Sequence, residues 1–212
     1  TPSDITRQIG GRITLWNDIV AHPDYDAWWR ERDARRATKG ITSSVLMVGG
    51  TYDAEDPFGV WKVYRSLKEN NPKLDCRIVV GPWAHGAWRS NDDANRLGEV
   101  EFSPESMSEF YRKEVEFPFF EQKLRGVGDG GASTSGALIF FSGENCWREM
   151  EEWNAEKQTP TKFYLQEDGS LRKDAPIVAD SYSLYTSDPK NPVPYYHDTS
   201  TTRKNEYVTA GQ

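Results

Sequence analysis

Two residues of this sequence carry groups that could transfer a proton together: the carboxyl of Asp53 and the imidazole of His85. A carboxylate beside an imidazole orients the ring and stabilises its protonated form, as a general base requires. Each residue follows a short apolar run, Val45–Val48 before Asp53 and Cys76–Val80 before His85. The pair can act only if the chain between the two runs folds back on itself.

The segment between these runs has the pattern of a helix flanked by two strands. Both runs are short, apolar and followed by glycine, as buried strands often are. Asp56 and Pro57 are typical of a helix start, and an Asn-Asn-Pro sequence ends the helix. The apolar residues of the helix recur at steps of three: Phe58, Trp61, Tyr64 and Leu67. A unit of this kind predicts parallel strands with a right-handed crossover, which places Asp53 and His85 at the same edge of the sheet.

The sequences around both residues resemble one family of hydrolases. GTYDAED contains Asp53 and VVGPWAHG contains His85, and four more motifs stand in the family's order: HPDYDAWW, FPFFEQKLRG, SGENCWREMEEW and SDPKNPVPYY. Together they resemble the α-amino-acid ester hydrolases, glutaryl-7-aminocephalosporanic-acid acylases and cocaine esterases, a group of serine hydrolases with the X-Pro dipeptidyl peptidases as a close relative. The resemblance covers nearly the whole chain. It implies that Asp53 and His85 are the acid and base of a catalytic triad, in the chain order Ser, Asp, His.

The resemblance also implies an α/β fold: the C-terminal part of an α/β-hydrolase domain, followed by the start of a jelly-roll-like β-sandwich domain. Residues 1–130 would form the hydrolase part, with the end of a helical cap in about 1–40, and residues 131–212 an incomplete sandwich. The Gly/Ser/Thr-rich stretch Gly126–Gly136 is itself typical of a linker. Short strand-like runs with turn signals between them follow it, as in an antiparallel sandwich: Ala137–Phe141, Thr161–Leu165 and Tyr182–Tyr185.

Helices are expected on both sides of the central unit. Ser103-Pro104-Glu105 predicts the start of a helix with Ser103 as its cap, and Gly126 predicts its end. Pro118 within this helix predicts a kink. In the cap, a helix is expected to start near Asp24, whereas Asn17–Val20 predicts a short helical turn at best.

The nucleophile that the resemblance implies is missing from the sequence. Hydrolases of this fold carry the serine in G-x-S-x-G or a similar elbow between a strand and a helix, and these 212 residues contain no such elbow. Ser43 and Ser44 precede a strand, and Ser142 has no helix after it. We therefore expect the serine and the oxyanion donors in an N-terminal part of the same protein that precedes Thr1. Residues 1–212 alone are expected to be inactive and prone to associate.

Two acidic residues after Asp53 suggest a preference for a cationic substrate group. By resemblance to the α-amino-acid ester hydrolases, Glu55 and Asp56 belong to a carboxylate cluster that binds the α-ammonium group. Coulomb attraction of a cation is the physical reason. An ordinary helix cap is the alternative for Asp56, and simple exposure is the alternative for Glu55. The same two charges would repel a glutaryl side chain, which ranks the glutaryl-acylase activity second.

Composition and residue spacing argue against several classes of protein and of binding site. The net charge of −7 argues against a nucleic-acid-binding protein, and no apolar run is long enough for a transmembrane helix. Cys76 and Cys146 have neither a disulfide-framework nor a metal-ligand spacing. The oxygen-rich run Asn91–Asn95 lacks the spacing of a calcium loop, and His22, held extended before a proline, is read as structural. No metal and no organic cofactor is implied.

These observations lead to one expected function and several alternatives. The expected function is hydrolysis of ester or amide bonds of a small-molecule acyl substrate, most of all of α-amino acyl compounds, through an acyl-serine intermediate. Glutaryl-cephalosporanic-acid acylase activity, X-Pro dipeptidyl peptidase-like activity and a non-catalytic β-sandwich binding module are the alternatives. The resemblance favours a periplasmic or secreted protein, while the compartment itself and the oligomeric state, a homo-oligomer included, stay open.

Overall fold

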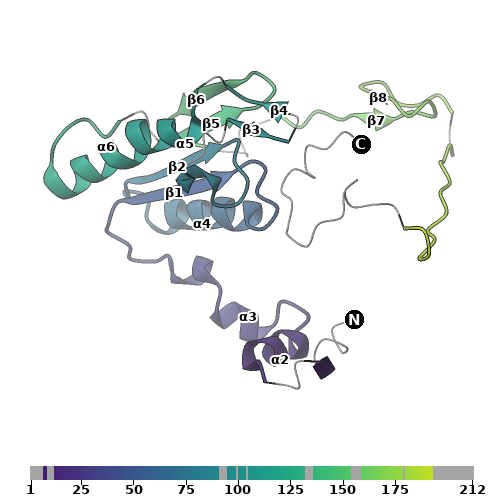
Figure 1. Cartoon of the computed structure of the whole chain (residues 1–212), viewed down its shortest axis with the longest axis horizontal. Helices are drawn as coiled ribbons and strands as arrows, with labels where there is room; N and C mark the ends of the chain where they lie inside the picture. The colour runs from purple at the N-terminus through teal and green to yellow at the C-terminus, as the bar shows by residue number, and fades with distance from the viewer. Residues whose placement is uncertain are drawn as a thin grey trace.

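The structure is a computed structural model of the chain, shown in Figure 1. It describes these residues: 7–8, 12–90, 95–98, 100–103, 105–131, 136–153, 159–178 and 180–192. Among these residues, no helix has the length and apolar character that a membrane span needs.

A mixed four-stranded sheet forms the centre of the described chain. Its strands are β1 (Val45–Gly50), β2 (Cys76–Gly81), β5 (Ala137–Phe141) and β6 (Cys146–Met150), and they lie in the order β1-β2-β5-β6. β1, β2 and β5 are parallel, and β6 is antiparallel to β5. All residues of β2 are buried, which suits a strand covered on both faces. The α/β class predicted from the sequence, with its parallel strands, is confirmed.

Helix α4 (Pro57–Asn70) connects β1 to β2 and covers one face of the sheet, as Figure 1 shows. Its residues Tyr64 and Leu67 are buried against Ile78, Val80 and Ile139 of the strands. The strand–helix–strand unit predicted from the sequence is therefore present. The predicted apolar face does not include its first member, because the side chain of Phe58 is largely exposed.

A second helical run covers the opposite face. It consists of α5 (Met107–Phe110), a π-helical stretch η3 (Tyr111–Glu116), α6 (Phe117–Phe120) and a second π-helical stretch η4 (Glu121–Arg125). The side chains that it buries against the sheet include Met107, Tyr111 and Val115.

Three details of this run were predicted from the sequence. The cap is Ser106, whose hydroxyl accepts from the Glu109 N–H, so the prediction of Ser103 is wrong. Pro118, expected at a kink, lies in α6 between the two π-helical stretches, where the backbone stays helical. Gly126 ends the run in the left-handed conformation, with φ of 68°, as predicted.

The segment after Gly126 differs from the expected sandwich. Ala137–Phe141 is not a strand of an antiparallel sandwich, because as β5 it pairs in parallel with β2 in the central sheet. The physical reason is that four of its five residues are buried, and such an apolar run suits the interior of a parallel sheet equally well. The division expected near residue 130 does not interrupt this sheet and stays a prediction.

Within residues 159–178 and 180–192, the strands that follow β6 are short. β7 (Tyr164–Leu165) and β8 (Leu171–Arg172) pair as a two-stranded antiparallel sheet, and Tyr182–Tyr185 is not a strand. A β-sandwich is therefore not confirmed. A further small sheet, β3 (Arg96–Leu97) with β4 (Val100–Glu101), precedes the second helical run.

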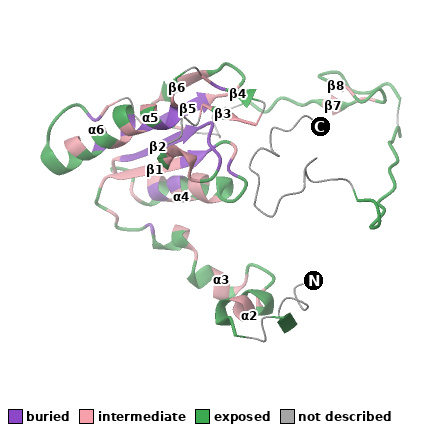
Figure 2. Cartoon of the chain, in the orientation of Figure 1, coloured by how far each residue is buried: buried purple, intermediate pink, exposed green. Residues whose placement is uncertain are grey.

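The N-terminal segment contains small helices with no buried residues: α2 (Thr14–Ala21), α3 (Ala27–Glu31) and the 3₁₀ turn η1 (Ala34–Ala37). α2 is longer than the short turn expected at Asn17–Val20. Figure 2 shows this segment exposed or half-buried, whereas the buried residues gather around the central sheet. Its assignment to a helical cap stays a prediction.

Candidate active site

The loops that follow β1 and β2 are bonded to each other at the carboxyl edge of the sheet. The Thr51 N–H donates to the Gly81 carbonyl at 2.8 Å, and the Tyr52 N–H donates to the Trp83 carbonyl at 3.1 Å. Gly50 allows this approach, because a Cβ there would lie only 2.1 Å from the Trp83 carbonyl oxygen. The two loops that carry Asp53 and His85 are thus fixed relative to each other.

Asp53 is buried and both of its carboxylate oxygens are engaged. Oδ1 accepts from the backbone N–H groups of Glu55 at 2.8 Å and Asp56 at 3.1 Å. Oδ2 lies 2.9 Å from Nδ1 of His85. Only 4% of the Asp53 side chain is exposed, compared with 42% of the His85 side chain. The carboxylate is therefore held in place by the backbone and faces the imidazole, as an orienting acid does.

Asp56 contributes a second carboxylate to the same imidazole. Asp56 stands at the N-cap position of α4, as the alternative predicted, but its side chain makes no capping hydrogen bond to the helix. One of its oxygens lies 3.7 Å from His85 Nδ1, and 71% of the side chain is exposed. Asp53 and Asp56 together place two negative charges beside His85, one buried and one open to solvent.

A pocket of about 270 Å³ opens beside these residues. Asp53, Asp56 and His85 line it, with apolar contributions from Val48, Gly49, Gly50, Pro57, Val60 and Trp88. Glu55 does not line this pocket. Of the two acidic residues predicted to bind the substrate, the structure thus places only Asp56 in the pocket wall.

Sequence reasoning missed Arg89, the basic residue that lines the pocket. It ends the short 3₁₀ turn η2 (Ala87–Arg89), which begins after Gly86 in the left-handed conformation with φ of 73°. A glycine directly after the histidine is the one signal that the chain turns there, because positive φ favours glycine. The turn directs Arg89 back to the pocket. The pocket wall therefore carries a positive charge at Arg89 in addition to the negative charge at Asp56.

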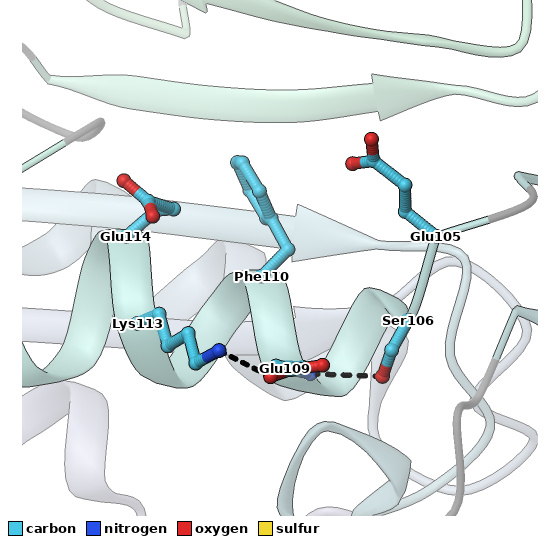
Figure 3. Close-up of a pocket in the computed structure, with 6 residues that line it drawn as sticks. All are labelled: Glu105, Ser106, Glu109, Phe110, Lys113 and Glu114. Carbon is cyan, nitrogen blue, oxygen red and sulfur yellow. Dashed lines mark hydrogen bonds and ion pairs between the residues drawn. The ribbon is translucent and has the colours of Figure 1, made fainter.

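Two other features lie outside this pocket. His22 pairs with Asp26 and stacks on Trp28 in the N-terminal segment, which agrees with the structural reading. Figure 3 shows a separate hollow on the second helical run, lined by Glu105, Ser106, Glu109, Phe110, Lys113 and Glu114. There Lys113 is paired with Glu109, and the Glu109 N–H with Ser106. Both contacts stabilise the first turns of the second helical run.

No serine is among the residues of the described chain that line the pocket. Ser142 lies in the turn between β5 and β6. Its position agrees with the expectation that it is not the nucleophile. A nucleophile outside this chain stays a prediction.

The known proteins that this chain is similar to carry the names of hydrolases. Residues 3–87 match the X-Pro dipeptidyl-peptidase (S15) family. The cocaine esterase of Rhodococcus sp. (strain MB1 Bresler) is 26% identical over 194 residues, which are 87% of this chain and 32% of that protein. A crystal structure of an aminopeptidase from a marine sediment archaeon, Thaumarchaeota archaeon, matches with a TM-score of 0.78 and 31% identity over 98% of this chain and 33% of that one.

The chain spans about a third of the length of these relatives. The family match includes both Asp53 and His85, since it begins before β1 and ends at Ala87. The resemblance to the cocaine esterase and X-Pro dipeptidyl-peptidase group of hydrolases, inferred from the motifs around Asp53 and His85, is confirmed by these similarities.

Proposed function

We propose that this chain supplies the acid and base of a serine hydrolase that cleaves ester or amide bonds of small acyl compounds, most of all α-amino acyl compounds. The observation that carries the proposal is the 2.9 Å contact between Asp53 Oδ2 and His85 Nδ1 at the wall of a pocket. The names of the similar proteins, an esterase and two kinds of peptidase, support the reaction class.

In this proposal the imidazole has the tautomer that Asp53 selects. Nδ1–H donates a hydrogen bond to the Asp53 carboxylate, so the proton stays on Nδ1 and Nε2 is left as the acceptor. Nε2 takes the proton from the serine hydroxyl as the oxygen attacks the acyl carbon, and the imidazolium then protonates the leaving group. Water repeats the sequence on the acyl-serine. The serine and oxyanion donors of this reaction come from outside residues 1–212.

The preference for α-amino acyl compounds is assigned mainly to Asp56. Its carboxylate lines the pocket, is free of a side-chain capping bond and lies near His85, so an α-ammonium group there would be beside the reacting bond. A charge-assisted hydrogen bond of this kind contributes about 1.5–3 kcal/mol. Glu55, outside the pocket lining, would act on the ammonium only at longer range.

Arg89 favours a second candidate substrate. A positive charge in the pocket wall would attract an acyl group with its own carboxylate, such as a glutaryl group. This observation weakens the argument that Glu55 and Asp56 exclude glutaryl compounds. X-Pro dipeptidyl peptidase-like activity also needs an ammonium site, and Asp56 serves it equally well.

The test compares four forms of the full-length protein on paired esters with and without a free α-amino group. Asp56→Asn should raise KM about ten- to a hundredfold for the amino ester and leave the des-amino ester nearly unchanged. Glu55→Gln is the matched control, since it removes a neighbouring charge outside the pocket lining. A glutaryl ester is added as a third substrate, and Arg89→Gln should raise KM for this ester alone.

Two results would contradict the proposal. Equal losses on both esters in Asp56→Asn would show that Asp56 does not recognise the ammonium group. Absence of any esterase or amidase activity in the wild-type full-length protein would favour the binding-module alternative.

A further inference from the structure

We propose that Asp53, Asp56 and His85 form a binding site for a divalent metal ion of the zinc class, and that a bound ion switches off the general base. The binding itself depends only on the three side chains. The inhibition rests on the proposed function. Such an ion would be a regulator or inhibitor of the site and takes no part in the proposed reaction.

The distances among the three side chains suit a small ion. Each offers one ligand atom, and these atoms lie within 4.8 Å of one another. Nδ1 of His85 lies 2.9 Å from Asp53 Oδ2 and 3.7 Å from Asp56 Oδ2. Bonds of about 2.0–2.2 Å in a tetrahedral zinc site put neighbouring ligand atoms roughly 3.3–3.6 Å apart. The cluster therefore needs only small side-chain shifts, mostly of the exposed Asp56, to hold an ion.

The chemistry of the ligands selects the class of metal. Zinc binds imidazole nitrogen and carboxylate oxygen, and three protein ligands leave a fourth position for water or another ligand. Calcium and magnesium prefer ligand sets made of oxygen alone. The buried Asp53 is also anchored by the N–H groups of Glu55 and Asp56, the kind of second interaction that orients a metal-binding carboxylate. The site is thus built on one fixed carboxylate and one adjustable carboxylate.

A metal on Nδ1 would reverse the tautomer of His85. A neutral imidazole carries one proton, and the nitrogen that binds the metal cannot keep it. The proton then stays on Nε2, which becomes a donor and can no longer accept the proton of a nucleophile. The ion also displaces the hydrogen bond from Nδ1 to Asp53. Metal binding and general-base catalysis are therefore mutually exclusive at this imidazole.

Calorimetric titration of the full-length protein with zinc chloride tests the binding. Asp56→Asn should lower the affinity of one site at least about tenfold, since even partners outside the coordination shell can matter this much. Asp56 is 71% exposed, so this substitution leaves the fold intact. Glu55→Gln and His22→Gln are matched controls: the first removes an adjacent charge, and the second removes the other His–Asp pair. Unchanged zinc affinity in Asp56→Asn, or no zinc binding in the wild type, would overturn the inference.

An activity measurement separates this inference from the proposed function. Zinc should inhibit ester hydrolysis reversibly, with recovery on adding a chelator, and Asp56→Asn should need at least about tenfold more zinc for half-inhibition. One outcome is that the wild type binds zinc, Asp56→Asn does not, and the wild type hydrolyses no ester. That outcome would support the metal site and overturn the proposed function. Hydrolysis that zinc does not affect would overturn the inhibition and leave the proposed function standing.

Discussion

In the part of the chain that the structure describes, His22–Asp26 and His85–Asp53 are histidine–aspartate pairs that use the same atoms in very different surroundings. His22 Nδ1 lies 2.5 Å from Asp26 Oδ2, and His85 Nδ1 lies 2.9 Å from Asp53 Oδ2. In the first pair both side chains are about a third or more exposed, whereas the second aspartate is almost fully buried. A His–Asp contact alone therefore does not define an active site, and the surroundings of each pair decide its role.

The first pair is local and serves a helix. His22 and Asp26 are four residues apart, and Asp26 Oδ1 accepts from the Trp28 N–H at the start of α3. The second pair joins loops after two strands, with Asp53 held by backbone N–H groups and His85 at a pocket. A candidate site is therefore identified by a buried, anchored acid beside an accessible imidazole.

Removal of the two imidazoles should have the most unequal effects. In the full-length protein, His85→Ala should lower kcat for an activated ester on the order of 10⁴- to 10⁶-fold, because base and nucleophile act as a unit. His22→Ala should leave kcat within about twofold, as expected of a substitution away from the reacting atoms. Steady-state kinetics of both variants measure this contrast, and similar losses in the two would break it.

Neutralising the two acids should give the next largest contrast. Asp53→Asn should lower kcat about 10⁴-fold, since an amide no longer selects the correct imidazole tautomer. Asp26→Asn should change kcat little, because its carboxylate bonds only within the N-terminal segment. The two variants are matched in chemistry, so equal rates would show that the Asp53 contact does not support catalysis.

The hydrogen bonds between the two loops predict that alanine substitutions at Gly50 and Gly59 change the stability in opposite directions. Gly50→Ala should destabilise the protein by roughly 1–3 kcal/mol, because the new Cβ would meet the Trp83 carbonyl. Gly59→Ala in α4, with nothing within 4 Å of its Cβ, should stabilise it by about 0.5–1 kcal/mol through helix propensity. Urea unfolding of the full-length protein measures both changes. Gly50→Ala with wild-type stability would show that the loops can separate at no cost.

The smallest expected effect is a change in the pKa of Asp26, in the exposed His22–Asp26 pair. The hydrogen bond from His22 lowers the pKa of Asp26 below its ordinary 3.8. Because the folded-state pKa is lowered, the associated stability is present above about pH 3.8 and is lost as the pH falls through the lowered pKa. NMR titration of the Asp26 carboxyl should show a midpoint below 3.8 that rises in His22→Gln. A midpoint that does not move would exclude the hydrogen bond in solution.

The sequence predicted the parts that depend on local pattern. The apolar runs, the Asp56-Pro57 helix start and the stop of the helical run at Gly126 lead directly to the observed β1–α4–β2 unit and its partner helices. The closeness of Asp53 and His85 then follows from strand direction alone. These features needed no knowledge of distant contacts.

Features that depend on long-range packing could not be predicted from the local sequence pattern. Ala137–Phe141 is apolar throughout, and such a run does not distinguish a sandwich strand from the interior of a parallel sheet. The position of Asp56 at a helix cap gave no sign that its carboxylate faces His85 instead of the helix. Arg89 lies in the pocket because of the turn at Gly86, which no periodic pattern reveals.

We infer that Asp53 and His85 activate a serine that lies outside residues 1–212 of the same protein. A fluorophosphonate that labels activated serines, followed by peptide mass spectrometry of the full-length protein, tests it most directly. We predict one labelled serine outside residues 1–212, labelled in the wild type and His22→Ala and not in His85→Ala. A labelled serine within residues 1–212, or undiminished labelling in His85→Ala, would contradict the account.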